Sequence, residues 1–163
     1  MCHPLPFRGT MSHPGSLRFI VSAEPRSQGS MTAVYNRRLG IARVRHANAP
    51  ALSLWRAQCK HAAQGAGAVV WQGPIGMRMV FGLHAPQDRR HGYPKRPDLD
   101  KLVRAVLDAL TDVCYKDDSQ VIRLRASKVW APTTLIEVWQ IERQAAQGQQ
   151  SIWRNNAQRL ETD

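Results

Sequence analysis

The sequence predicts one compact α+β domain: a mixed β-sheet with two main helices, in the chain order strand, helix, strand, helix, strand, strand. Two observations predict this class. The 163 residues, 43% of them hydrophobic, suffice for one packed core and are few for two domains. Short β-rich runs also alternate with longer segments whose apolar residues recur every three or four positions. We expect a flexible leader over residues 1–16, the domain over 17–143 and a polar tail over 144–163.

The first predicted elements are a strand and a helix separated by a basic loop. Residues 17–21 (L-R-F-I-V) are typical of a short strand. Residues 25–50 are rich in Arg, Gly, Ser and Asn, and we expect a loop with limited local structure that contacts phosphate groups. An apolar stripe over residues 52–63 then predicts an amphipathic helix that ends at Gly65 or Gly67.

The remaining predicted elements are a strand, a second helix and two late strands. Residues 75–84 predict a strand whose alternate apolar residues pack in the core. After a basic loop, apolar residues recur at three- and four-residue steps over residues 99–110, which predicts a helix with Asp98 at its cap. Residues 120–128 and 134–141 predict two strands that could pair as a hairpin.

The charge balance indicates a polyanionic partner. Lys and Arg number 23 against 12 Asp and Glu, a formal net charge of +11, and 18 of the basic residues are Arg. Arg is the planar donor suited to phosphate oxygens, so nucleic acid is the expected partner. The basic residues expected to contact DNA lie in the two predicted loops and are Arg26, Arg37, Arg38, Arg89, Arg90, Lys95 and Arg96.

Other function classes have little support in the sequence. No apolar run approaches the roughly 20 residues that a membrane span needs, and the first residues lack the apolar segment of a signal peptide. We therefore expect an intracellular protein that does not contact membranes. The three cysteines form no C-x-x-C pair and the histidines are scattered, so neither a disulfide framework nor a zinc site is indicated. We expect no organic cofactor.

Half of the acidic residues fall within 21 positions, from Asp98 to Asp118. The structural interpretation is helix capping and turns, because the helix dipole favours first-turn carboxylates by about 0.3–1 kcal/mol. The functional interpretation is a divalent-metal site, since converging carboxylates repel one another unless a cation holds them. This second interpretation needs Asp98 at the cap with non-helical backbone angles, and Asp118 returned toward the same helix N-terminus. A hard cation in basic surroundings is suited to phosphodiester hydrolysis.

Three segments together resemble the RusA family of Holliday junction resolvases. Residues 96–102 (R-P-D-L-D-K-L), 108–110 (D-A-L) and 117–121 (D-D-S-Q-V) follow the family pattern, roughly R-x-D-L-D-N-L-x-K-A-x-x-D-A-L and then D-D-x-Q-V. A weaker resemblance extends over residues 17–141. It implies a RusA-like fold and a Mg²⁺-dependent endodeoxyribonuclease, with Mn²⁺ able to replace Mg²⁺. It further implies a homodimer that resolves four-way DNA junctions by symmetric nicking in recombination and repair, in a bacterial, phage or prophage cytoplasm.

The resemblance also implies roles for individual residues. The catalytic metal ligands would be Asp98, Asp100 and Asp118. Arg104 stands where the family has a catalytic lysine, and Lys101 where it has an asparagine. An arginine keeps the positive charge but does not release a proton near neutral pH. If the family lysine moves a proton, this chain would be slow or would use Lys101. The residues expected to support the site are Lys101, Asp108 and Asp117.

Alternatives stay open at this level. The chain could be a non-catalytic basic nucleic-acid-binding protein whose aspartates are caps and turns, or a nuclease that cuts flaps and other branched DNA. We rank the binding protein lower, because carboxylates beside a basic loop weaken phosphate contacts. Arg104 has its own alternative, an ion pair with Asp100 and Asp108 along the helix. The sequence predicts neither the number of metal ions, nor the cleavage sequence, nor the dimer interface.

Overall fold

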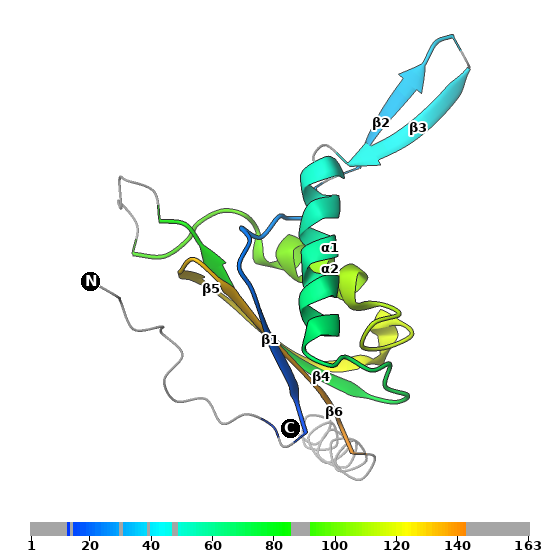
Figure 1. Ribbon diagram of the computed structural model, residues 1–163. Helices are drawn as coiled ribbons and strands as arrows, with labels where there is room; N and C mark the ends of the chain where they lie inside the picture. Colours follow the sequence, from blue (N-terminus) through cyan, green and yellow to red (C-terminus); the bar gives the residue numbers. More distant parts are fainter. Residues whose placement is uncertain are drawn as a thin grey trace, which may run out of the picture.

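A computed structural model describes residues 13, 15–29, 31–38, 40–46, 49–85 and 92–142. Its body is a four-stranded sheet with two helices packed against it, and a two-stranded hairpin stands away from this body (Figure 1). The mixed sheet and the two helices confirm the predicted α+β class. In the part of the chain that is described, no helix combines the length and apolar character needed to cross a membrane.

The sheet has the spatial order β1-β6-β4-β5. Strand β6 is antiparallel to both of its neighbours, whereas β4 and β5 are parallel. The predicted hairpin between the two late strands is therefore wrong, because β4 lies between them. Parallel neighbours need a crossover connection, and a helix supplies it here. The strands are β1 (Leu17–Val21), β4 (Ile75–Leu83), β5 (Val121–Trp130) and β6 (Thr134–Gln140).

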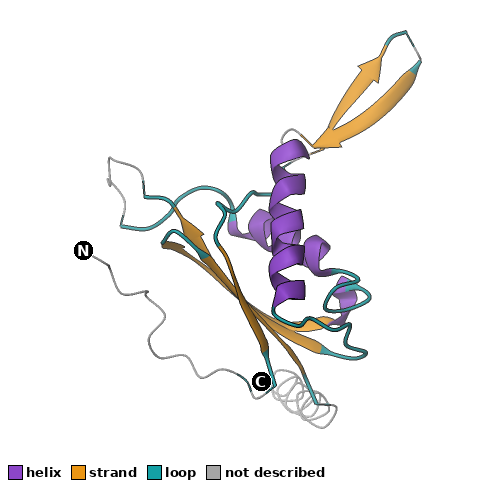
Figure 2. Cartoon of the chain, in the orientation of Figure 1, coloured by secondary structure: helices purple, strands orange, loops and turns teal. Residues whose placement is uncertain are grey.

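Two helices cover the sheet, α1 (Ala49–Gly65) and α2 (Leu99–Leu110) (Figure 2). Both were predicted, α2 with its observed bounds and α1 ending at the first of the two expected glycines. Trp55 of α1 and Leu102 of α2 are buried in one core with Met77 of β4. Burial also raises the pKa of the Cys59 thiol to about 12, as expected for a cysteine that packs in the core.

A β-hairpin replaces the loop predicted over residues 25–50. It consists of β2 (Met31–Asn36) and β3 (Ile41–His46), which pair antiparallel and form a sheet of their own. The prediction was wrong because it weighted the high Arg and Gly content of the segment. Arg43 and Arg45 in fact alternate with apolar residues, a pattern typical of a strand. Gly40 has a φ of 65° in the connecting turn, a value that glycine adopts without strain.

The direction of α2 decides where the site residues lie. As the crossover between β4 and β5, α2 runs opposite to both strands, so its N-terminus lies by the end of β5 (Figure 1). The Lys128 Nζ near that end donates to the Pro97 carbonyl at 2.8 Å and to the Lys95 carbonyl at 3.2 Å. The C-terminus of α2 leads through a short 3-10 helix, η1 (Asp118–Gln120), to the start of β5.

The end of the predicted leader contacts β6. The His13 backbone N–H and the Ser16 hydroxyl both donate to Glu137 Oε1, at 3.2 and 3.0 Å. The His13 ring stacks on Trp139 with 3.9 Å between ring centroids. Residues 1–12 and the predicted tail lie outside the described residues, so their character remains a prediction.

Candidate metal centre

Asp98 occupies the N-cap position of α2 without capping it. Its backbone has φ −64° and ψ 137°, the non-helical angles that the metal-site interpretation requires. Its side chain accepts no capping hydrogen bond from the backbone N–H groups of the first turn. Instead, Asp98 Oδ2 lies 2.7 Å from the Lys101 Nζ, and both side chains are partly exposed. The Asp98 carboxylate is therefore not committed to holding the helix end.

The electrostatics of this helix end keep Asp98 ionised. A hydrogen bond and the charge of Lys101 lower the pKa of Asp98, and Lys128 and Arg96 lower it further. The same pair raises the pKa of the Lys101 ammonium group. Asp98 is thus negatively charged at neutral pH, as a metal ligand must be.

Asp100 and Arg104 are exposed on the first two turns of α2. They are four positions apart, so they lie on the same side of the helix. Neither makes an ion pair with another described residue, and the alternative pair of Arg104 with Asp100 or Asp108 is not formed. Both side chains are therefore available to a ligand approaching this end of α2.

Asp108 fastens α1 to α2. Its carboxylate forms an ion pair with Arg56 of α1. The same guanidinium donates to Gln28 Oε1 at 2.9 Å, and the Gln28 backbone N–H donates to the Lys101 carbonyl at 3.1 Å. The segment after β1 is thereby held against the first turn of α2. Asp108 can support the site through this framework.

Asp117 caps η1. Its side chain accepts from the Ser119 backbone N–H at 2.9 Å, and Gln120 Oε1 accepts from the Asp117 N–H at 3.1 Å. The bonds from Ser119 lower the pKa of Asp117. Gln120 Nε2 also donates to the carbonyls of Trp71 and Gly73, which fixes the chain before β4. The turn interpretation therefore accounts for Asp117, while Asp118 stays exposed at the start of η1.

One chain does not bring the three predicted ligands together. Asp98 and Asp100 lie at the N-terminal end of α2, whereas Asp118 follows its C-terminal end (Figure 1). The 12 residues of α2 give a helix about 18 Å long. Asp118 does not return to the helix N-terminus as expected, because the crossover returns the chain to the opposite end of the sheet. Within the described ranges, no three His, Cys, Asp or Glu side chains cluster closely enough to hold a metal ion.

Basic side chains surround the N-terminus of α2. Lys95 and Arg96 are exposed immediately before Asp98. Lys128 joins them from β5. No local sequence pattern indicates this residue, because its contact with Pro97 depends on the crossover. The other predicted DNA contacts are not at this helix end. Arg26 forms an ion pair with Glu24 at 2.8 Å, and Arg37 and Arg38 are exposed in the turn of the hairpin. Arg89 and Arg90 are outside the described residues.

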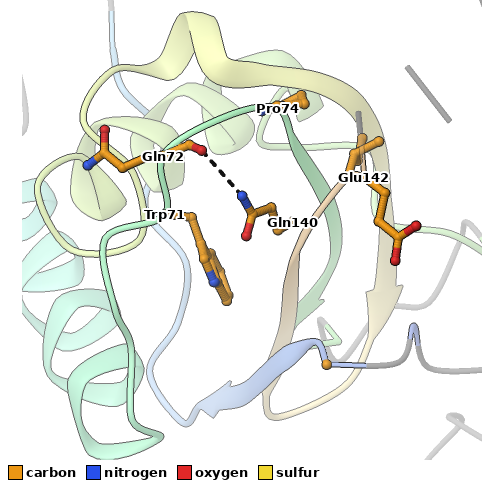
Figure 3. Close-up of a pocket in the computed structure, with 7 residues that line it drawn as sticks. Trp71, Gln72, Pro74, Gln140 and Glu142 are labelled. Carbon is orange, nitrogen blue, oxygen red and sulfur yellow. Dashed lines mark hydrogen bonds between the residues drawn. The ribbon is translucent and has the colours of Figure 1, made fainter. Parts of the chain in front are cut away.

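A pocket of about 480 Å³ lies at the other end of the sheet, by the start of β4 and the end of β6 (Figure 3). Gln140 Nε2 donates to the Gln72 carbonyl across it, at 3.2 Å. The described residues that line it include Glu142 and no Lys or Arg. The basic end of α2, where Lys95 and Arg96 are exposed beside Asp98, is the better candidate for a site that binds phosphate.

Comparison with known proteins places the chain in a family. The family model described as endodeoxyribonuclease RusA matches residues 29–141, more than half of the chain. The chain belongs to the RusA family. The match includes every aspartate of the predicted site, and the RusA resemblance inferred from residues 96–121 is confirmed.

A curated relative matches a shorter stretch. The uncharacterized protein YqaN of Bacillus subtilis (strain 168) is 46% identical to this RusA-family chain over 43 residues. The match covers 26% of this chain and 30% of YqaN. The chain thus spans less than a third of this relative, whose printed name states no activity.

Proposed function

We propose that this RusA-family chain is a Mg²⁺-dependent endodeoxyribonuclease that nicks four-way DNA junctions and related branched DNA in recombination and repair. The observation that carries the proposal is the N-terminus of α2. There Asp98 is an exposed, ionised carboxylate, and Asp100 is exposed and forms no ion pair with another described residue; Lys95 and Arg96 precede them in the chain. The cations can attract a phosphate backbone, and the carboxylates beside them can hold a metal ion. This combination is suited to phosphodiester hydrolysis.

The donor set at this end of α2 fits Mg²⁺. This ion prefers one or two carboxylates together with water and phosphate oxygens. Asp98 does not cap the helix and Asp100 has no ion-pair partner among the described residues, so both can serve as oxygen ligands. Once bound, the ion supplies polarisation of the phosphate and a lowered pKa for bound water. Lys95 and Arg96 would hold flanking phosphates that bare carboxylates repel, and Arg104 would add positive charge beside Asp100.

The position of Asp118 makes a homodimer part of the proposal. If Asp118 is a third ligand, it must come from another copy, because in its own chain it lies at the far end of α2. In the proposed dimer, a two-fold axis relates the two copies and their α2 helices run in opposite directions. Asp118 of each copy would then lie beside Asp98 and Asp100 of its partner. Such a dimer has two equivalent sites, as symmetric nicking of a four-way junction requires.

The β5 edge offers a surface for this dimer. Among the described strands only β4 pairs with β5, so the other edge of β5 presents free backbone groups. Ile122 and Leu124 on it are large apolar residues with exposed fractions of 49% and 45%. Strand β5 begins next to Asp118 and ends next to the N-terminus of α2. If the β5 strands of two copies paired antiparallel, the start of one β5, next to Asp118, would therefore lie beside the end of the other, next to Asp98 and Asp100.

Cleavage of a four-way junction, a flap and a plain duplex, compared in Mg²⁺, tests the function. We expect the wild-type chain to nick the junction. Asp100→Asn and Asp118→Asn should bind the junction as well or better but lose nicking on the order of 100-fold or more, because each removes a metal ligand. Asp112→Asn is the matched control: Asp112 pairs with Lys116 on the surface and has a φ of 60°, which asparagine tolerates, so nicking should be unchanged.

The contrary outcomes are distinct. If the chain nicks none of the substrates in either Mg²⁺ or Mn²⁺, the proposed nuclease activity is wrong, and the alternative of a non-catalytic nucleic-acid-binding protein is favoured. Preferential cutting of the flap would mean that the flap, and not the four-way junction, is the preferred substrate; the proposed metal chemistry would still hold. Full activity of Asp100→Asn would overturn the metal site.

A further inference from the structure

The Lys101 ammonium group occupies the Asp98 carboxylate that the proposed metal would bind. Their charged atoms are 2.7 Å apart. We infer that Lys101 is a built-in competitor of the divalent cation, which must displace it from Asp98, so that Lys101 sets the metal affinity of this chain. The inference rests on the proposed function and deepens it.

Both cations cannot share Asp98 without cost. Mg²⁺ binds carboxylate oxygens at about 2.0–2.1 Å. With the ammonium nitrogen 2.7 Å from Asp98 Oδ2, a metal bound to the same oxygen would lie within about 5 Å of it, where like charges repel. Lys101 has a long flexible stem and a partly exposed side chain, so it can move into solvent when the metal binds.

The other nearby cations do not compete in this way. The Lys128 ammonium donates to the Pro97 and Lys95 carbonyls, which holds it on the backbone. Arg96 acts on Asp98 through its charge alone. Among the described residues, Lys101 is therefore the cation in direct contact with a proposed metal ligand.

Titration of the full-length protein with MnCl₂ in the absence of DNA tests the inference, with free Mn²⁺ measured by electron paramagnetic resonance. Lys101→Met removes the charge and cannot hydrogen-bond to Asp98, so it should bind Mn²⁺ about 3- to 30-fold more tightly. Lys101→Gln serves as a second uncharged variant. Lys101→Arg keeps the charge and should bind as the wild type does. Lys60→Met is the matched control, because Lys60 is exposed on α1 and its charge acts on Asp112 at the other end of α2.

Each outcome has one meaning. Unchanged or weaker Mn²⁺ binding by both uncharged Lys101 variants overturns the inference. An equal gain for Lys60→Met also overturns it, since net charge would then explain the effect. The proposed function survives both results if Asp100→Asn still loses metal binding and nicking. If neither Asp98→Asn nor Asp100→Asn changes Mn²⁺ binding, the metal site and the competitor fail together.

Discussion

At the scale of residues, the aspartates between positions 98 and 118 separate into two groups by the contacts of their side chains. One group has partners that hold the fold together, and the other is exposed at the two ends of α2. A carboxylate is structural where its partner holds the fold, as a cap or an ion pair with the body does. Asp98 is paired with the flexible Lys101 at the same helix end, and Asp100 and Asp118 form no ion pair with another described residue, so these three carboxylates can take a cation. The structural group is Asp108 with Arg56, Asp112 with Lys116, and Asp117 with the Ser119 N–H; the exposed group is Asp98, Asp100 and Asp118.

Arg104 gives a prediction at this scale. A guanidinium does not release a proton near neutral pH, so Arg104 can act through its charge and its N–H donors but not as a general acid. We expect Arg104→Lys to nick junctions within about threefold of the wild-type rate, and Arg104→Gln to be slower by about tenfold or more. Single-turnover nicking rates from pH 6 to 9 would measure both. A nicking rate for Arg104→Lys that is much higher than the wild-type rate and rises or falls with pH as one group titrates would contradict this prediction. It would mean that a lysine at this position moves a proton, a role that Arg104 does not perform.

At the scale of elements, a close approach of backbone fixes the end of β4. A Cβ added to Gly82 would lie 1.9 Å from the Thr133 carbonyl oxygen, and the Gly82 N–H donates to Thr134 Oγ1 at 3.2 Å. These contacts hold the end of β4 against the turn before β6. No side chain fits there unless backbone moves.

Gly82→Ala should therefore destabilise the protein by about 1–3 kcal/mol or more. Gly65→Ala is the control, since an added Cβ on this last residue of α1 meets no atom within 4 Å. It should be neutral, or more stable by up to about 1 kcal/mol. Urea unfolding followed by circular dichroism measures both, and equal stabilities of the two variants would contradict the close approach.

The hairpin β2–β3 is an element that amino-acid composition alone does not predict. Its strands pair only with each other among the described strands, and isolated hairpins are marginally stable in water. Arg37 and Arg38 are exposed in its turn, so the predicted phosphate contacts would be made from an arm rather than from a loop on the body.

At the scale of the whole molecule, the opposite positions of Asp100 and Asp118 give a test of the shared site. In the proposed dimer, each site combines Asp98 and Asp100 of one copy with Asp118 of the other. A heterodimer of an Asp100→Asn chain and an Asp118→Asn chain would then keep one complete site. After subunit exchange, the mixture should recover about a quarter of wild-type nicking, because half of the dimers have one of two sites intact.

A mixture of Asp98→Asn with Asp100→Asn is the control. Both changes fall on the same half of the site, so no dimer of these chains has a complete one. The measurement is strand nicking of a labelled junction by each mixture. Recovery in the control alone, or in neither mixture, would argue against sites shared between copies.

The sequence by itself determined the family, the helix α2 and the residue types of the site. The spacing of apolar residues over 99–110 predicts α2 because helical periodicity is local, and the motif of residues 96–121 identifies RusA without any contact being known. Tertiary structure decided how those residues are arranged. Pairing of β4 with β5 is long-range, and it makes α2 a crossover that separates Asp118 from Asp98 and Asp100. It also brings Lys128 to Pro97, because strand pairing and helix packing join segments whose local patterns are independent.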